Sequence, residues 1–219
     1  MELPPLALSF WIAMNATVLG LVMGLPLAWL LARRTLPARD LLTILILLPM
    51  VLPPTVLGYY LLIVVGQGGP VGWLAETLGL GRIVFTQTAA VIAAFVASAP
   101  FLIRAAQAGF EQVDPAYVEA ARTLGRSELA IWLTITLPLA WRAVLAGLAL
   151  AFARAVGEFG ATVMVAGSIP GRTRTGSIAI YDMVQAGRMQ EANVLAIALA
   201  FTTAGVLFLL TRVGRTPSW

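Results

Sequence analysis

The chain has 219 residues, of which 60% are hydrophobic and 11% are charged, and its formal net charge is +4. This composition, with a mean hydropathy of +0.92, excludes an ordinary soluble domain and predicts a membrane protein. The chain has no cysteine, no histidine and no lysine, so every basic residue is arginine. Disulfides, thiolate or imidazole metal sites, histidine-based catalysis and a lysine-containing phosphate loop are therefore excluded. We predict no catalytic residue, no metal site and no cofactor.

Long apolar runs predict transmembrane helices. The runs cover residues 6–32, 41–65, 84–103, 139–166 and 194–210. A helix of about 20 residues crosses the hydrocarbon core of a membrane, so each run can span it. We therefore predict an all-α polytopic membrane protein with five transmembrane helices, in which residues 1–219 form a single domain.

Glycines and prolines mark special positions in the first two runs. Gly20 and Gly24 form a small-xxx-small pair, which serves either packing within the chain or a specific dimer contact. The second run contains Pro49, Pro53 and Pro54, each of which removes an amide donor, so the helix should bend or open there. Either this kink improves packing, or Pro53 and Pro54 line a transport pathway in a broken helix.

The polar loop at residues 111–138 lies between the third and fourth runs and predicts a short helix. Asp114 can cap the helix, and Pro115 suits its first position. Gly125 can end the helix in a left-handed conformation. A compact helix displayed in a loop of a membrane protein indicates a docking element.

The side chains of this helix divide between two faces. Ala116, Ala120 and Leu124 recur at intervals of four and form one small apolar face suited to close approach. Glu119 and Arg122 fall on another face, where we expect them to be free to pair with a partner. A helix lying on the bilayer surface is the alternative, but it would need bulkier apolar residues and a richer basic face.

The fourth run contains two ionisable residues, Arg154 and Glu158. Their spacing of four places them on one helix face. A charge at membrane depth costs roughly 3 kcal/mol unless it is paired or hydrated. One interpretation is that the two residues neutralise each other. The other is that they are candidate pathway residues, with Arg154 offering charge to a passing anion. The two interpretations can coexist.

The distribution of arginine predicts the orientation of the chain. Nine arginines flank or lie in the segments on one side: Arg33, Arg34, Arg39, Arg104, Arg122, Arg126, Arg142, Arg212 and Arg215. Four lie on the other side: Arg82, Arg172, Arg174 and Arg188. The positive-inside rule places the loop at 111–138 and the C-terminus in the cytoplasm and the N-terminus outside the inner (plasma) membrane. The basic residues report topology, and no nucleic-acid partner is predicted.

The loop also carries a family resemblance. Its residues 119–125, "EAARTLG", are followed nine residues after Gly125 by "TITLP", ending at Pro138. This pattern resembles the EAA loop of type I ABC importer permeases. The segments "LPPTVLGYYLL", "FARAVGEFGATVMVAGSIPGRTRT" and "SIAIY" resemble molybdate permease subunits over most of the chain. Arg172 departs from the acidic or polar residue expected after "IPG".

The resemblance implies a fold, a function and partners. The chain would have the type I ABC importer permease fold and form half of a homodimeric pore in membrane lipid. An ABC ATPase would bind each copy on the cytoplasmic face, and a periplasmic or lipid-anchored oxyanion-binding protein would dock outside. The residues implied in ATPase coupling are Glu119, Ala120, Ala121, Leu124, Gly125 and Pro138.

The expected substrate is molybdate, and the expectation extends to tungstate, a tetrahedral dianion of nearly the same size. Within the same class, a sulfate or thiosulfate importer permease is the alternative, although such permeases usually have a sixth span. Outside it, the alternative is an autonomous secondary anion transporter. Such a transporter generally needs an ion-binding path and often two related halves. Only Arg154 and Glu158 qualify for that path, and no internal repeat is present.

Overall fold

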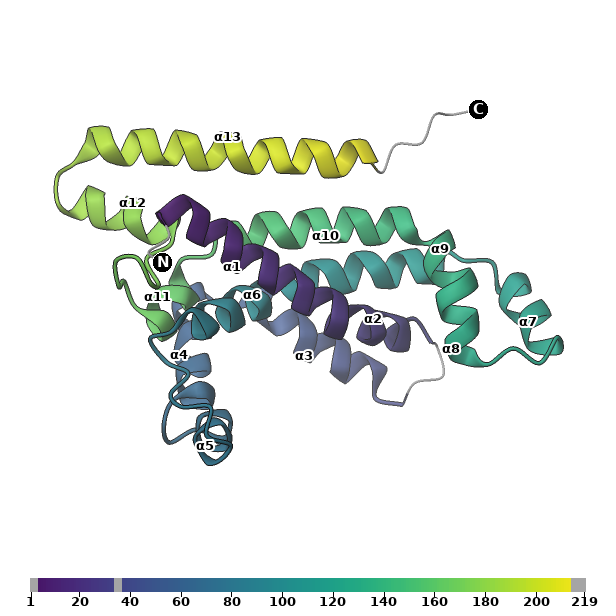
Figure 1. Cartoon of the computed structure of the whole chain (residues 1–219). Coiled ribbons are helices and arrows are strands. Elements are labelled where there is room, and N and C mark those ends of the chain that lie inside the picture. Colours follow the sequence, from purple (N-terminus) through teal and green to yellow (C-terminus); the bar gives the residue numbers. More distant parts are fainter. Residues whose placement is uncertain (1–3, 34–36, 214–219) are drawn as a thin grey trace.

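A computed structural model describes residues 4–33 and 37–213 of the chain (Figure 1). These residues form helices joined by turns and contain no strand, so the all-α prediction is confirmed. Arg34 and Arg215, which contributed to the predicted orientation, lie outside the described residues.

The helices follow one another closely along the chain. The first part contains α1 (Pro5–Leu19), the π-helical turn η1 (Gly20–Gly24), α2 (Leu25–Ala32), α3 (Arg39–Val51), α4 (Pro54–Val65), α5 (Pro70–Thr77) and α6 (Gln87–Glu111). The second part contains α7 (Pro115–Thr123), α8 (Glu128–Ile131), the π-helical turn η2 (Trp132–Thr136), α9 (Leu137–Leu139), α10 (Trp141–Val156), α11 (Gly160–Ala166), α12 (Gly176–Gln185) and α13 (Met189–Val213).

Helix α6 is the centre around which the other helices pack. It contacts α1, α2, α3, α4, α10 and α11. Alanine is the commonest of its buried residues, with Ala89, Ala93 and Ala97 among them. Small side chains let the backbones of membrane helices approach closely, where van der Waals contact replaces the missing hydrophobic drive.

The glycine pair of the first span packs against this central helix. A Cβ atom added to Gly20 would lie 3.2 Å from a methyl carbon of Leu102, and one added to Gly24 would lie 3.2 Å from Cγ1 of Ile103. Both neighbours belong to α6. Of the two interpretations of this pair, packing within the chain is therefore the one that the structure supports.

Two of the predicted runs are broken in the structure. In the second run α3 ends at Val51 and α4 begins at Pro54, so the break predicted from the prolines is confirmed. In the fourth run α10 ends at Val156 and α11 begins at Gly160. This second break was not predicted from the sequence, because Gly157 lies in an apolar run with no proline to mark it.

Four stretches are long and apolar enough to cross a membrane by length and composition: Pro5–Ala32, Pro54–Thr77, Gln87–Glu111 and Met189–Leu210. A fifth candidate is the pair Glu128–Leu139 and Trp141–Val156, which is bent by 77°. The first, third and fourth of these stretches overlap the first, third and fifth predicted runs, although Gln87–Glu111 continues eight residues beyond the third run. The second candidate is displaced toward the C-terminus because of the break before Pro54, and the last pair includes part of the predicted polar loop.

The close contact between α6 and α10 gives a test of the packing. A Cβ atom added to Gly109 would collide with Cβ of Ala143 on α10, whereas one added to Gly205 on α13 meets nothing within 4 Å. We expect Gly109→Ala to destabilise the purified protein by about 1 to 3 kcal/mol through overpacking. Thermal unfolding in detergent measures the effect. Gly205→Ala is the matched control, and equal unfolding temperatures for the two variants would contradict this packing.

Candidate functional site

Helix α7 has the boundaries that the sequence predicts. The Asp114 carboxylate accepts a hydrogen bond from the Ala116 amide at 2.9 Å, and Pro115 occupies the first helical position. At the other end Gly125 has a φ of 75°. The Gly125 amide donates to the Arg122 carbonyl, and the Arg126 amide donates to the Ala121 carbonyl. These two bonds form the Schellman arrangement, which favours glycine at the left-handed position.

The outer face of α7 is open. Ala121 points toward the rest of the chain and is buried, whereas Ala116, Ala120 and Leu124 are exposed. Leu124 is 82% exposed, a high value for a large apolar side chain. Glu119 is also exposed. Figure 1 shows α7 at one extreme end of the molecule, beyond the ends of α6 and α10, where a partner can reach this face.

The expectation that Arg122 is free to pair with a partner is wrong. Its Nε donates to Glu128 Oε1 at 2.7 Å, and its Nη2 donates to Glu128 Oε2 at 3.2 Å. The pKa of the Arg122 guanidinium is raised, chiefly by this hydrogen bonding and secondly by the negative charge of Glu128. Arg33, the residue after α2, also donates to Glu128 Oε2 at 2.9 Å. Glu128 was not predicted as a site residue, because nothing in the sequence around it reveals two arginine partners.

Pro138 lies apart from α7. It is an exposed residue of α9, whereas α7 packs on α8 and η2. The chain turns sharply into α10 two residues later, after Ala140. Because proline lacks an amide hydrogen, Pro138 leaves a carbonyl of the preceding turn without a helical partner, which suits the approach to a bend.

Arg154 and Glu158 come together at the break between α10 and α11. Arg154 Nη1 lies 2.6 Å from Glu158 Oε2. The Glu158 side chain is 1% exposed and that of Arg154 is 29% exposed. Glu158 Oε1 accepts a hydrogen bond from the Ala161 amide at 2.8 Å, and its carbonyl accepts one from the Ser177 hydroxyl at 2.9 Å. Glu158 thus contacts Arg154 before the break and Ala161 and Ser177 after it. These contacts favour the interpretation in which Arg154 and Glu158 neutralise each other.

The structure brings the proline break close to this second break. Pro53 and Pro54 are exposed at the start of α4. Helix α4 packs on α11 without room for larger side chains, because a Cβ atom added to Gly160 would lie 2.6 Å from Cβ of Pro54. A Cβ atom added to Gly58 would lie 2.7 Å from Cβ of Met164. The two breaks, from runs that are distant in the sequence, therefore lie next to each other.

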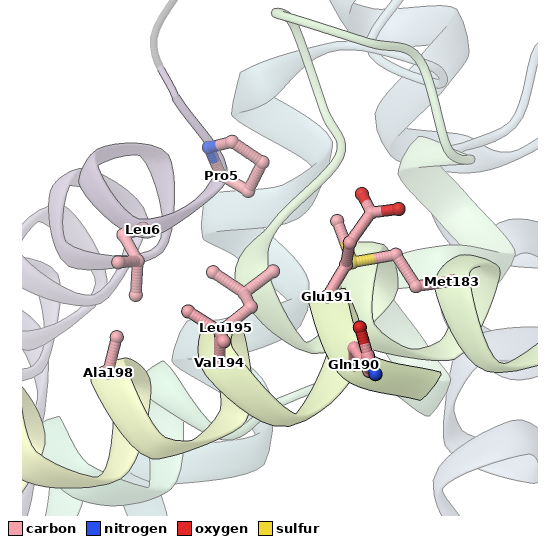
Figure 2. A pocket seen from close by; sticks show the side chains of 8 residues that line it. All are labelled: Pro5, Leu6, Met183, Gln190, Glu191, Val194, Leu195 and Ala198. Atoms are coloured by element: carbon pink, nitrogen blue, oxygen red, sulfur yellow. The ribbon is translucent and has the colours of Figure 1, made fainter. Parts of the chain in front are cut away.

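Two pockets of the described chain differ in character. One of about 450 Å³ lies between α1, α12 and α13, and Figure 2 shows Leu6 of α1 facing Leu195 and Ala198 of α13 across it. Its lining is largely apolar, and its one carboxylate, Glu191, pairs with Arg188. The other, of about 510 Å³, lies beside α7 and is lined by charged and apolar side chains: Ala32, Arg33, Phe110, Glu111, Val113, Pro115, Val118, Glu119 and Arg122. The charged pocket belongs to the α7 region, whereas the apolar one touches neither candidate site.

The described part of the chain contains no candidate metal site. Within residues 4–33 and 37–213, no three carboxylate, imidazole or thiol side chains gather to hold a metal ion. The two candidate sites are the open outer face of α7 and the pair of broken helices with a buried ion pair.

Comparison with known proteins connects these features to a family. Residues 16–215 match the family described as binding-protein-dependent transport system inner membrane component. The chain is 39% identical over 209 residues to the molybdenum transport system permease protein ModB of Azotobacter vinelandii, covering 95% of this chain and 92% of that protein. It is also 39% identical to the protein of that name from Escherichia coli K12, covering 95% and 93%.

A solved structure shares the fold. It is a bacterial alginate ABC transporter in complex with an alginate pentasaccharide-bound periplasmic protein. The likeness has a TM-score of 0.76 at 16% sequence identity and covers 98% of this chain and 80% of the other. At this identity the comparison shows the fold alone, which is that of an ABC transporter permease.

The ion pair between Arg154 and Glu158 can be tested by comparing the loss of one partner with the loss of the other. Replacing Glu158 with glutamine strands a guanidinium that stays charged, whereas replacing Arg154 strands a carboxylate that can take up a proton. We expect Glu158→Gln to destabilise the protein by about 3 kcal/mol or more. Membrane abundance and thermal stability should both fall further in Glu158→Gln than in Arg154→Gln. The double variant should recover part of the loss, as coupled pairs do. Additive effects of the two changes would show that the pair contributes nothing as a unit.

Proposed function

The chain belongs to the family of binding-protein-dependent transport system inner membrane components, and we propose that it is the pore-forming subunit of an ATP-driven importer for molybdate. The observation that carries this proposal is the 39% identity over 95% of the chain to permeases named for molybdenum transport. The subunit receives the oxyanion from an external binding protein. It transmits the action of a separate ATPase and is not itself an enzyme.

The ATPase docks on α7. Its exposed Ala116 and Ala120 permit close approach, and the exposed Leu124 offers an apolar anchor. Glu119 lies beside them, where a basic group of the ATPase can pair with it. Ala121 and Gly125 act differently, because Ala121 seats the helix on its own chain and Gly125 fixes its end. Pro138 acts at a distance, near the bend between α9 and α10.

The binding protein docks at the opposite end. There the loop at residues 167–175 and α12 lie far from α7 (Figure 1). Arg174 holds this end in place, since its Nε lies 3.0 Å from the Ser168 hydroxyl and 3.1 Å from an Asp182 oxygen. Arg172 is exposed beside them and can meet an acidic surface. The related alginate transporter was solved with a periplasmic protein bound.

The pathway runs between two copies of the chain. Helix α6 fills the middle of the described bundle, so a pathway within one copy would have to displace its closely packed side chains. A pathway between copies needs no such opening. The exposed Pro53 and Pro54 and the partly exposed Arg154 are the groups that we place along it. An arginine at this position suits a divalent oxyanion, and molybdate and tungstate share that chemistry.

The orientation follows the arginine pattern. The chain is a multi-pass protein of the inner membrane, and residues 1–219 form one transmembrane domain. Helix α1 starts at the end of the bundle opposite α7, and α13 finishes toward the end that holds α7 (Figure 1). With α7 and the loop at 111–138 in the cytoplasm, the N-terminus lies outside and the C-terminus inside, in agreement with the positive-inside rule.

Reconstitution tests the function directly. The chain is placed in vesicles with its cognate ATPase and oxyanion-binding protein, and uptake of molybdate, tungstate and sulfate is measured. We expect molybdate uptake that needs both ATP and the loaded binding protein. Uptake by the chain without the ATPase would indicate a secondary transporter, and ATP-driven uptake of sulfate in preference to molybdate would indicate the sulfate alternative.

The role of α7 is tested at its last turn. We expect Gly125→Val to act through backbone strain, because Gly125 has a φ of 75°. A steric clash is not expected, because nothing lies within 4 Å of a Cβ atom added there. A β-branched residue in this conformation costs about 1 to 2 kcal/mol or more. Molybdate uptake and substrate-stimulated ATP hydrolysis should fall together, while membrane insertion is retained. Gly125→Asn is the matched control, because asparagine tolerates the left-handed conformation. Full activity of the valine variant would refute the docking role.

A further inference from the structure

We propose that Glu128 is a positioning residue that makes α7 and the end of the first span move as one unit. The inference rests on the proposed function, because it concerns how a displacement of α7 by the ATPase reaches the membrane helices. Glu128 is the first residue of α8, and its carboxylate accepts hydrogen bonds from two arginines on different elements. One of them, Arg33, is 95 residues away in the sequence.

The first arm of this connection holds α7. Arg122, in its last turn, donates to both carboxylate oxygens of Glu128 in a fork, the geometry that makes arginine–carboxylate pairs directional. Helix α7 has little else to fix it, since Ala121 is its one buried residue. The orientation of α7 relative to α8 therefore depends on the Arg122–Glu128 pair.

The second arm reaches the first span. Arg33 follows α2 directly, and its guanidinium carbon lies 4.0 Å from the ring centre of Trp29. The Trp29 ring stacks on that of Trp132, with centres 5.3 Å apart and planes inclined by 27°. Trp132 follows Glu128 by four residues along the same helical stretch. Glu128, Arg33, Trp29 and Trp132 thus close a ring between α8–η2 and α2, which the cation–π contact and the aromatic stack make stiff.

The end of α2 is held in turn by the central helix. The Leu31 carbonyl, near the end of α2, accepts a hydrogen bond from Arg39 Nε at 2.7 Å. Arg39 also pairs with Glu111, the last residue of α6. Gln107 on α6 donates to Glu111 at 2.9 Å. A displacement of α7 that passes through Glu128 therefore arrives at both α2 and α6.

This role differs from a contribution to stability. The side chains of Arg122, Glu128 and Arg33 are 53%, 44% and 36% exposed. Ion pairs at such exposure add little to the stability of a fold. Their geometry fixes relative orientation instead. Removing the carboxylate charge should therefore leave assembly and unfolding temperature nearly unchanged and should weaken the mechanical link.

The experiment compares Glu128→Gln with the wild-type chain in the reconstituted complex with the ATPase and the binding protein. We expect the number of molybdate ions moved per ATP hydrolysed to fall about fivefold, the low end of typical coupling effects. Basal ATP hydrolysis and complex stoichiometry should not change. Glu191→Gln is the matched control, because it removes the exposed Arg188–Glu191 pair, away from α7. A Glu128→Gln complex with the wild-type transport ratio would overturn the proposal.

A second variant and a distance measurement separate the possible failures. Arg33→Gln removes the contacts of Arg33 with Glu128 and Trp29, leaves the Arg122–Glu128 pair in place, and should lower the transport ratio even if Glu128→Gln assembles poorly. The chain has no native cysteine, so spin labels on single cysteines at the exposed positions Leu30 and Arg126 report the distance between α2 and the end of α7. In the wild type this distance should stay constant when ATP binds, and in Arg33→Gln it should change.

Each outcome has one meaning. A wild-type distance that changes with ATP, or an Arg33→Gln distance that stays constant, would overturn the link. Failure of the wild-type complex to take up molybdate would count against the proposed function instead. If the wild-type complex takes up molybdate normally and both variants keep the wild-type number of molybdate ions per ATP, the proposed function stands and the role of Glu128 is refuted.

Discussion

Close packing around α6 is the constraint on which the rest of the structure depends. In a membrane, apolar side chains gain nothing by leaving lipid for one another, so helices associate through tight van der Waals contact and a few polar bonds. The alanines of α6 and the glycines that face it, such as Gly20, Gly24 and Gly147, allow this contact with several helices at once. Helix α13 shows the opposite case, since none of its apolar window is buried within the chain.

The two broken helices show how a membrane protein manages backbone groups that lose their helical partners. Such groups cannot be left bare in hydrocarbon. At the α10–α11 break, Glu158 accepts the Ala161 amide and pairs with Arg154, and Ser177 bonds its carbonyl. At the α3–α4 break, two consecutive prolines supply no amide hydrogen to leave unsatisfied. The breaks meet because Gly58 and Gly160 let α4 lie directly on α11.

The two ends of this packed bundle present different surfaces. One end presents α7 with an open face of small and apolar side chains, and the other presents the loop at 167–175 held by Arg174 and Asp182. Polar contacts join the α7 end to the bundle, because Glu128 and Glu111 tie α7, α2, α3 and α6 together through arginines.

The sequence by itself determined the class of protein, the helical fold, the proline break and the limits of α7. These are local properties: the length of an apolar run, an amide missing at Pro53, a cap at Asp114 and a left-handed turn at Gly125 each act within a few residues. The tertiary structure alone decided which distant residues meet. Arg122 looked free because its partner Glu128 has no distinctive pattern, and the approach of Pro54 to Gly160 depends on how two helices from distant runs pack. The break after Val156 also depends on the tertiary structure, since Arg154, Ala161 and Ser177 bond to Glu158 there.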